Sequence, residues 1–143
     1  SAVQISQHIL IASQENFKEE DITMTEQCPY CNFDDYDVLA KNEFGVILPE
    51  PNALSKGHCV IIPLRHVGSF FDITDKERKS LLSLLELARN ELQLRHQPAG
   101  FHVGFNDGDV FDAKSEHLHI HIIPRYAGQT LKLDNRWGMS GQI

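Results

Sequence analysis

Three histidines stand at alternate positions in the stretch EHLHIHIIPR, which covers residues 116–125. Side chains alternate between two faces along a β-strand, so His117, His119 and His121 are expected on one face and the apolar residues between them on the other. Neutral imidazole binds metals and also acts as a nucleophile, so the row predicts metal ligands, catalytic groups or a mixture of the two. A merely solvated strand face would rarely use three of the eight histidines of the chain at strict alternation.

Two cysteines form the second motif with clear chemistry, CPYC at residues 28–31. This spacing allows two thiolates to chelate one zinc ion, and a structural zinc site usually has four ligands. The same letters resemble the redox motif of glutaredoxins, but such a motif follows a buried strand and opens a helix that lowers the thiol pKa. Here a polar, acidic stretch precedes the motif and NFDDYD follows it, which favours zinc. The third cysteine, Cys59 within HCVIIPL, is predicted to be a small core residue.

These residues need secondary-structure elements to bring them together, and five segments have the apolar and β-branched character of strands. They are residues 36–42, 44–50, 58–64, 100–106 and 116–123. One long helix is predicted from about Asp75 to His96, where leucines and an alanine recur at helical spacing. Thr74 and Glu77 have the spacing of a capping box at its start, and Pro98 ends the pattern.

The order of strands, one helix and further strands predicts an α+β domain, with an antiparallel sheet of about five strands and the long helix packed on one face. We expect a single domain over residues 28–143, preceded by an extension over 1–27. The net charge of −7 argues against a nucleic-acid partner, because phosphate backbones attract basic surfaces. Apolar runs are too short to cross a membrane and no signal-peptide pattern is visible, so a cytoplasmic protein without a membrane partner is expected.

Several segments together resemble one known family. HLHIHIIPR is similar to the signature of the histidine triad (HIT) nucleotide hydrolases and transferases, His-x-His-x-His followed by two apolar residues. KGHCVIIPLRHV resembles the family's Gly-His, apolar strand, Pro and Arg/Lys-x-His segment, and GFNDG resembles its Asn-x-Gly turn. The resemblance runs from about Cys28 to Ala127 and implies a HIT-like fold.

The resemblance implies a different role for each histidine of the triad. In zinc-containing members two cysteines and two histidines hold the metal, and the matching residues are Cys28, Cys31, His66 and His117. Four protein ligands close a tetrahedral site, so the zinc cofactor is expected to be structural. The middle histidine is the family's nucleophile toward the α-phosphorus of a nucleotide, and it matches His119. His121 is expected to hydrogen-bond the phosphate or the leaving group.

Expected substrate contacts come from residues around the triad. Asn106 matches the family's asparagine near the phosphate and ribose. Arg125 and Lys114 are local cations that can stabilise charge developing on the phosphate. His58 is expected on a strand of the same sheet, and for His58 and Arg65 both substrate contact and structural packing stay open.

One segment departs from the family pattern. Relatives usually carry Gly-Gln-Ser or Gly-Gln-Thr just before the triad, whereas this chain has Asp112, Ala113 and Lys114 within DAKSE. A hydroxyl contact is lost there and a cation is gained. We therefore predict that Lys114 changes the leaving-group preference, favouring polyphosphate over amine.

Two functions of different classes are compatible with these residues. The first is an enzyme that transfers or hydrolyses the nucleoside monophosphate group of dinucleoside polyphosphates or nucleoside phosphoramidates, through a covalent nucleotidyl-histidine intermediate. The second is a nucleotide-binding or partner-binding module with a structural zinc and little turnover. The intact middle histidine, His119, favours the enzyme. The family resemblance also implies a homodimer with the long helix and a neighbouring strand at its interface.

Overall fold

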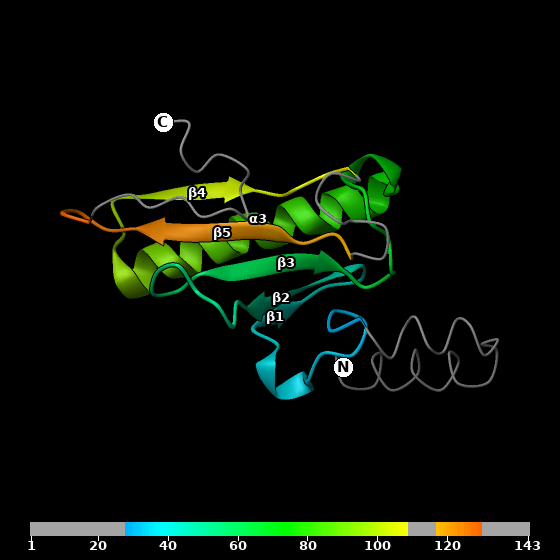
Figure 1. Cartoon of the computed structure of the whole chain (residues 1–143), viewed down its shortest axis with the longest axis horizontal. Helices are drawn as coiled ribbons and strands as arrows, with labels where there is room; N and C mark the ends of the chain where they lie inside the picture. Colours follow the sequence, from blue (N-terminus) through cyan, green and yellow to red (C-terminus); the bar gives the residue numbers. More distant parts are fainter. Residues whose placement is uncertain (1–27, 109–116, 130–143) are drawn as a thin grey trace.

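The computed structural model of the chain describes residues 28–108 and 117–129. Within these ranges the chain forms a five-stranded antiparallel sheet, ordered β1-β2-β3-β5-β4, and one long helix, α3 (Figure 1). The strands are β1 (Ala40–Lys41), β2 (Gly45–Pro49), β3 (Cys59–Pro63), β4 (Gly100–Gly104) and β5 (Ile120–Arg125). The predicted α+β architecture is confirmed.

Helix α3 spans Asp75–His96, as its sequence signals predict. The capping box is present, because the Glu77 N–H donates to Thr74 Oγ1 at 3.1 Å and the Thr74 N–H donates to Glu77 Oε1 at 2.9 Å. The helix stops before Gln97, whose left-handed backbone with φ 46° cannot continue an α-helix, and Pro98 follows. Local sequence therefore determines both ends of the helix.

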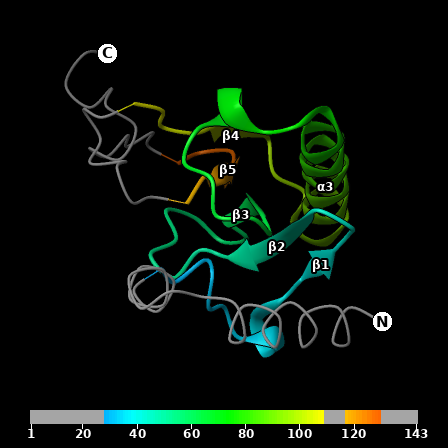
Figure 2. The same ribbon diagram turned by 90° about the vertical axis from the view of Figure 1, so that its right-hand side faces the viewer.

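One face of the sheet is covered by α3, which packs on β2, β3 and β5 (Figure 2). The helix buries Leu81, Leu84, Ala88 and Leu92. They join a core that includes Ile47, Ile61, Leu118, Ile120 and Ile122 from the sheet side. The thiol of Cys59 lies in the same core, as predicted, and burial raises its pKa to about 12. Burying each large aliphatic side chain stabilises the fold by about 1.5–3 kcal/mol, which makes this layer a firm support for the opposite face.

The opposite face, which we call the site face, carries His121. His121 pairs with Val60 of β3 and with Gly104 of β4, and directly paired residues lie on the same face. A second apolar cluster on this face consists of Val46, Leu48, Val60 and Ile62. The segment that precedes β1 packs onto this cluster through Tyr30, Phe33 and Val38. Residues near the beginning of the described chain are thereby brought to the face of the sheet that carries His121.

The first and last predicted strands differ most from the observed ones, whereas the other three differ by one or two residues at their ends. Of the strand predicted over 36–42, only Ala40–Lys41 pairs with β2, and Asp35–Asp37 forms a short 3-10 helix, η1. The carboxylate of Asp34 accepts the N–H of Tyr36 at 2.9 Å. Such a side chain to backbone hydrogen bond offers the chain a turn in place of a strand.

The last predicted strand begins later than expected, at Ile120. The backbone N–H of Leu118 donates to the Val67 carbonyl at 2.7 Å, outside the sheet, and β3 ends at Pro63, which has no N–H to donate to a facing strand. Leu118 nevertheless belongs to the core beneath α3, so the predicted division of this segment into two faces is confirmed.

Some predictions fall outside the described ranges, namely those on the extension at 1–27 and on the DAKSE segment with Lys114. In the ranges that are described, no helix is long and apolar enough to cross a membrane.

Candidate active site and metal centre

The four residues predicted to hold zinc lie together, although they come from three separate parts of the chain. The Sγ atom of Cys31 lies 3.2 Å from Nδ1 of His66 and 3.5 Å from Nδ1 of His117. The Sγ atom of Cys28 lies 3.6 Å from the same nitrogen of His117. In a tetrahedral zinc site, bonds of about 2.3 Å to sulfur and about 2.05 Å to nitrogen separate sulfur from nitrogen by about 3.5 Å. The observed spacings fit that geometry.

The protonation of these side chains also suits a metal. His117 is 1% exposed, and its Nε2–H donates to the Pro63 carbonyl at 2.6 Å, which leaves the Nδ1 lone pair directed at the cysteines. Burial lowers the pKa of His117 to about 4, so its ring is neutral at pH 7. Burial and the neighbouring Cys28 raise the pKa of Cys31 to about 12. A divalent cation would remove the thiol protons that this environment otherwise retains.

The local structure around each ligand explains its position. The N–H groups of Cys31 and Asn32 both donate to the Cys28 carbonyl at 3.2 Å, which closes the turn that brings the two thiols together. His66 follows Arg65, whose guanidinium binds the buried carboxylate of Glu77 at the start of α3, at 2.8 Å. Arg65 thus has a structural partner, and its packing interpretation is the one that the geometry favours.

His119 has the features that a nucleophilic imidazole requires. Its Nδ1 lies 2.9 Å from the backbone carbonyl of His117. Only an N–H can donate to a carbonyl, so the neutral ring carries its proton on Nδ1 and its free lone pair on Nε2. His119 is also partly exposed, whereas His117 and His121 are buried. Among the triad residues, His119 is therefore the one that combines a free nitrogen with access for a ligand.

His121 belongs to a separate chain of hydrogen bonds. The backbone N–H of Leu54 donates to Nδ1 of His58 at 3.0 Å, so the neutral His58 ring carries its proton on Nε2. That Nε2 lies 2.8 Å from Nδ1 of His121, which must accept the proton and keep its own N–H on Nε2. A carboxylate oxygen of Glu50 lies 3.9 Å from His121 Nδ1. His121 is thereby held as an N–H donor beside His119, with ring centroids 5.0 Å apart.

Glu50, His58 and His121 are close enough to be considered as metal ligands. The hydrogen bonds argue against that use. The Leu54 N–H occupies the lone pair at Nδ1 of His58, so the ring proton lies on Nε2, which then has no lone pair for a metal. The group fits a device that fixes the protonation of His121 better than a second metal site.

A family model described as HIT domain matches residues 34–128. The chain belongs to the HIT family. AP-4-A phosphorylase of Mycobacterium tuberculosis is 36% identical over 73 residues, which cover 50% of this chain and 37% of that protein. Bis(5'-adenosyl)-triphosphatase of Saccharomyces cerevisiae is 30% identical over 90 residues, which cover 62% of this chain and 44% of that protein. The matched region thus spans less than half the length of either relative.

Solved structures of HIT proteins share the fold. A zinc-bound histidine triad family protein from Mycobacterium smegmatis superposes with a TM-score of 0.66 at 18% identity, over 76% of this chain and 82% of that one. The five-stranded sheet with its single packed helix is accordingly a HIT fold.

Asn106 and Lys114 are two further residues of this HIT chain that are predicted to bind substrate. If the register of β4 with β5 is continued beyond Gly104, Asn106 stands opposite His119, as its predicted role requires. The neighbouring Asp107 anchors this turn by accepting the Ser69 hydroxyl at 3.0 Å. Lys114 lies outside the described ranges.

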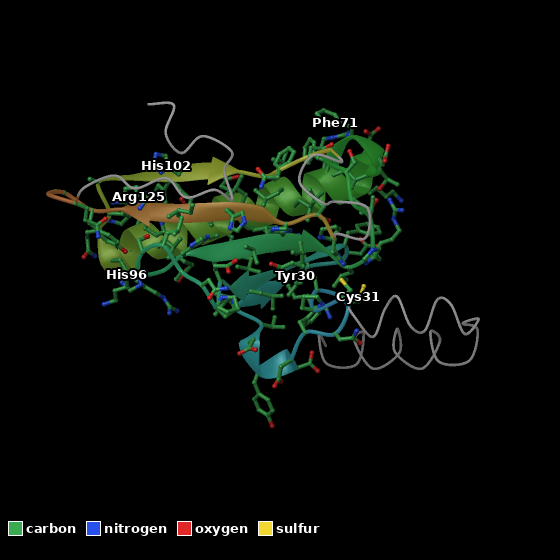
Figure 3. All side chains as sticks on the ribbon, in the orientation of Figure 1. Tyr30, Cys31, Phe71, His96, His102 and Arg125 are labelled. Atoms are coloured by element: carbon green, nitrogen blue, oxygen red, sulfur yellow. The ribbon has the colours of Figure 1, made fainter. Side chains whose placement is uncertain are left out.

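Arg125 does not join the cluster around His119. Its Nε donates to Nδ1 of His102 at 3.0 Å. Arg125 stands six positions after His119, which corresponds to about 20 Å along an extended chain. Figure 3 places Arg125 and His102 toward one end of the sheet and Cys31 toward the other. Arg125 is therefore too far along β5 to contact a phosphorus under attack by His119, and its role as a substrate ligand stays a prediction.

Sequence reasoning missed three contributors to the site, namely Tyr30, Glu50 and the backbone N–H of Leu54. The sequence contains only weak indications for two of them. Glu50 directly follows a predicted strand, and Tyr30 stands between the two cysteines. The N–H of Leu54 had none, since every residue except proline carries that group.

Proposed function

We propose that this HIT protein hydrolyses or transfers the nucleoside monophosphate group of nucleotide conjugates, such as dinucleoside polyphosphates and nucleoside phosphoramidates. The observation that carries this proposal is the 2.9 Å hydrogen bond between Nδ1 of His119 and the His117 carbonyl, which leaves Nε2 free on a partly exposed ring. The names of the two relatives, a phosphorylase and a triphosphatase of adenosine polyphosphates, support substrates of the same class.

In the first step, Nε2 of His119 forms a bond to the α-phosphorus while the bond from phosphorus to the leaving group breaks, and the leaving group departs with its electron pair. In the second step, water attacks the phosphorus and releases one proton to the solvent, and the nitrogen–phosphorus bond pair returns to Nε2. Throughout, the Nε2–H of His121 would donate to a phosphate or leaving-group oxygen. His58 keeps that proton in place through its 2.8 Å hydrogen bond to His121.

Cys28, Cys31, His66 and His117 would hold a structural zinc ion. Four protein ligands leave no open position for water, so bound zinc supplies a cross-link between the CPYC turn and the triad and no catalytic water. The new bond from His119 to phosphorus needs only the lone pair of the imidazole ring. Asn106 is proposed as a phosphate or ribose ligand, because Gly104 of β4 pairs with His121, and Asn106 and His119 each stand two residues from this pair.

The test of the proposed function is detection of the covalent intermediate. Wild-type protein would be mixed with a panel of adenosine and guanosine polyphosphates and phosphoramidates, quenched in alkali within milliseconds and analysed by mass spectrometry. We expect a nucleoside monophosphate adduct on the peptide that contains His119, and we expect His119→Ala to lose both adduct and turnover. Tight binding without turnover, equal in both proteins, would support the alternative of a binding module.

The metal is tested separately. Metal analysis of the purified protein should find about one zinc ion per chain, and His66→Ala should lower this value. His96→Ala is the matched control, because Figure 3 shows His96 at the end of the molecule far from Cys31. Equal zinc content in the two variants would contradict the ligand assignment.

The leaving-group preference is a further part of the proposal. Lys114→Ala should lower turnover of polyphosphates relative to phosphoramidates, since the ammonium group would stabilise the more highly charged leaving group. An unchanged ratio of the two rates would exclude this role for Lys114.

A further inference from the structure

Tyr30 stands between the two cysteines of the CPYC turn, yet its side chain lies against the triad. Its ring is stacked on the ring of His119, with centroids 5.0 Å apart and planes inclined by 30°. It also meets His117 edge-on at 6.0 Å and 70°. Figure 3 shows Tyr30 beside the sheet and close to Cys31, which comes from the same turn. A residue of the predicted metal motif thus contacts the predicted nucleophile.

The position of Tyr30 does not depend on His119. The turn that carries it is closed by the N–H groups of Cys31 and Asn32, which both donate to the Cys28 carbonyl at 3.2 Å. The ring packs against the buried apolar cluster of the site face. Its members are Val46, Leu48, Val60 and Ile62. Backbone hydrogen bonds and apolar packing therefore present a fixed aromatic face to the imidazole.

Three contacts together define the orientation of His119. The Nδ1–H is bound to the His117 carbonyl at 2.9 Å, Tyr30 covers a ring face, and His121 meets the ring nearly edge-on with planes inclined by 74°. The hydrogen bond alone would allow the ring to tilt about the N–H···O direction. Stacking removes that freedom, so Nε2 is held in one direction before a substrate arrives.

The same contact has an electrostatic consequence during the proposed reaction. When Nε2 of His119 forms its bond to phosphorus and the leaving group departs with the bond pair, Nδ1 keeps its proton, and the ring changes from neutral to positively charged. An aromatic face attracts a cation within about 6 Å of its centroid. The attraction is stronger in the charged intermediate and in the transition state that leads to it than in the free enzyme, and only such differential interactions accelerate a reaction.

We propose that Tyr30 is a positioning residue of His119 that also stabilises the positive charge of the nucleotidyl-histidine intermediate through its aromatic face. This inference rests on the proposed function, because it concerns the same nucleophile. It assigns the CPYC turn a second task, since the residue between the proposed metal ligands supports the reacting ring.

The first experiment compares Tyr30→Phe and Tyr30→Leu in the full chain. Single-turnover mixing with a dinucleoside polyphosphate measures the rate of adduct formation on His119. Tyr30→Leu should slow this rate about tenfold, because it removes the attraction between an aromatic face and a partly buried cation. Tyr30→Phe keeps the ring and should stay within about threefold of wild type. Phe33→Leu is the matched control, because Phe33 packs on the same apolar cluster and should leave the rate unchanged.

Zinc content and thermal midpoint of each variant are measured beside the rate, because a merely structural role would change these instead. A second series, with phenylalanine and progressively fluorinated phenylalanines at position 30, keeps the shape of the ring and withdraws electron density from its face. The rate of adduct formation should fall stepwise along this series. The series also decides the question if Tyr30→Leu loses its metal or fails to fold.

The outcomes separate this inference from the function on which it rests. Three results would overturn the role of Tyr30 and leave the proposed function intact. They are an equally fast adduct formation in wild type and Tyr30→Leu, a loss confined to KM, and a constant rate along the fluorinated series. No adduct on wild-type protein with any substrate would overturn both.

Discussion

Replacing Glu77 with glutamine tests how the segment that carries His66 is held against the helix. Two nitrogens of Arg65 donate to the Glu77 carboxylate, at 2.8 and 3.2 Å. The carboxylate side chain is 4% exposed and that of Arg65 is 53% exposed. Glutamine keeps an oxygen for the Thr74 N–H of the capping box but loses the charge. The substitution therefore removes the ion pair and leaves the helix cap.

The expected loss follows from the exposure of the two partners. Unit charges about 4 Å apart attract each other by about 4 kcal/mol at the effective dielectric constant near a protein surface. Water around the half-exposed guanidinium of Arg65 screens much of this. A net loss of about 1–2 kcal/mol in the free energy of unfolding is expected, which corresponds to about 2–8 °C in the thermal midpoint for a chain of this size.

The effect should depend on pH in one direction. The hydrogen bonds from Arg65 lower the pKa of Glu77 in the folded protein, despite the opposing effect of burial. A carboxyl group whose folded pKa is lowered contributes its stabilisation in full above its unfolded pKa of about 4.3 and loses it as the pH falls through the folded pKa. The difference between wild type and Glu77→Gln should accordingly be largest near neutral pH and shrink toward pH 3.

Urea unfolding at pH 7 and in steps down to pH 3 measures this difference directly. Glu91→Gln is the control, because Glu91 pairs with Arg95 on α3 at 3.5 Å and both side chains are mainly exposed. The control should change the stability by less than about 0.5 kcal/mol. Equal losses in the two variants at pH 7, or a Glu77→Gln difference that stays constant down to pH 3, would refute the reasoning.

Three further predictions concern Gly57, the contact between Arg125 and His102, and the buried thiol of Cys59. Gly57→Ala should lower the free energy of unfolding by about 1–3 kcal/mol, because φ is 92° and an added Cβ would lie 2.7 Å from Leu92 Cδ2; full stability in urea would contradict this. Arg125→Gln should raise the pKa of His102, which burial and the guanidinium both lower, and an unchanged NMR titration would argue against the contact. Cys59, with a pKa of about 12, should resist iodoacetamide at pH 8 until urea unfolds the chain, and rapid labelling of the native protein would show that the thiol is accessible.

The helix and the apolar strands were predictable because their signals are local. The capping box at Thr74 and Glu77 and the spacing of the leucines are properties of neighbouring residues. The ends of the first and last strands were not predictable in the same way. Hydrogen bonding by the Asp34 side chain and the missing N–H of Pro63 decided where the ladders stop, and the second effect requires knowledge of which strands pair.

For the site, the sequence by itself determined which chemical groups are available and that alternate residues of the triad segment face the same way, because alternation follows from the extended backbone. Tertiary structure decided what each group can do. The carbonyls of Pro63 and His117 and the N–H of Leu54 decide which ring nitrogen of His117, His119 and His58 carries the proton. Cys28 and His117 meet across 89 positions, and the stack of Tyr30 on His119 arises only when the CPYC turn packs on the sheet. Backbone hydrogen-bond partners and ring contacts of this kind arise only in the folded chain, and no residue type encodes them locally.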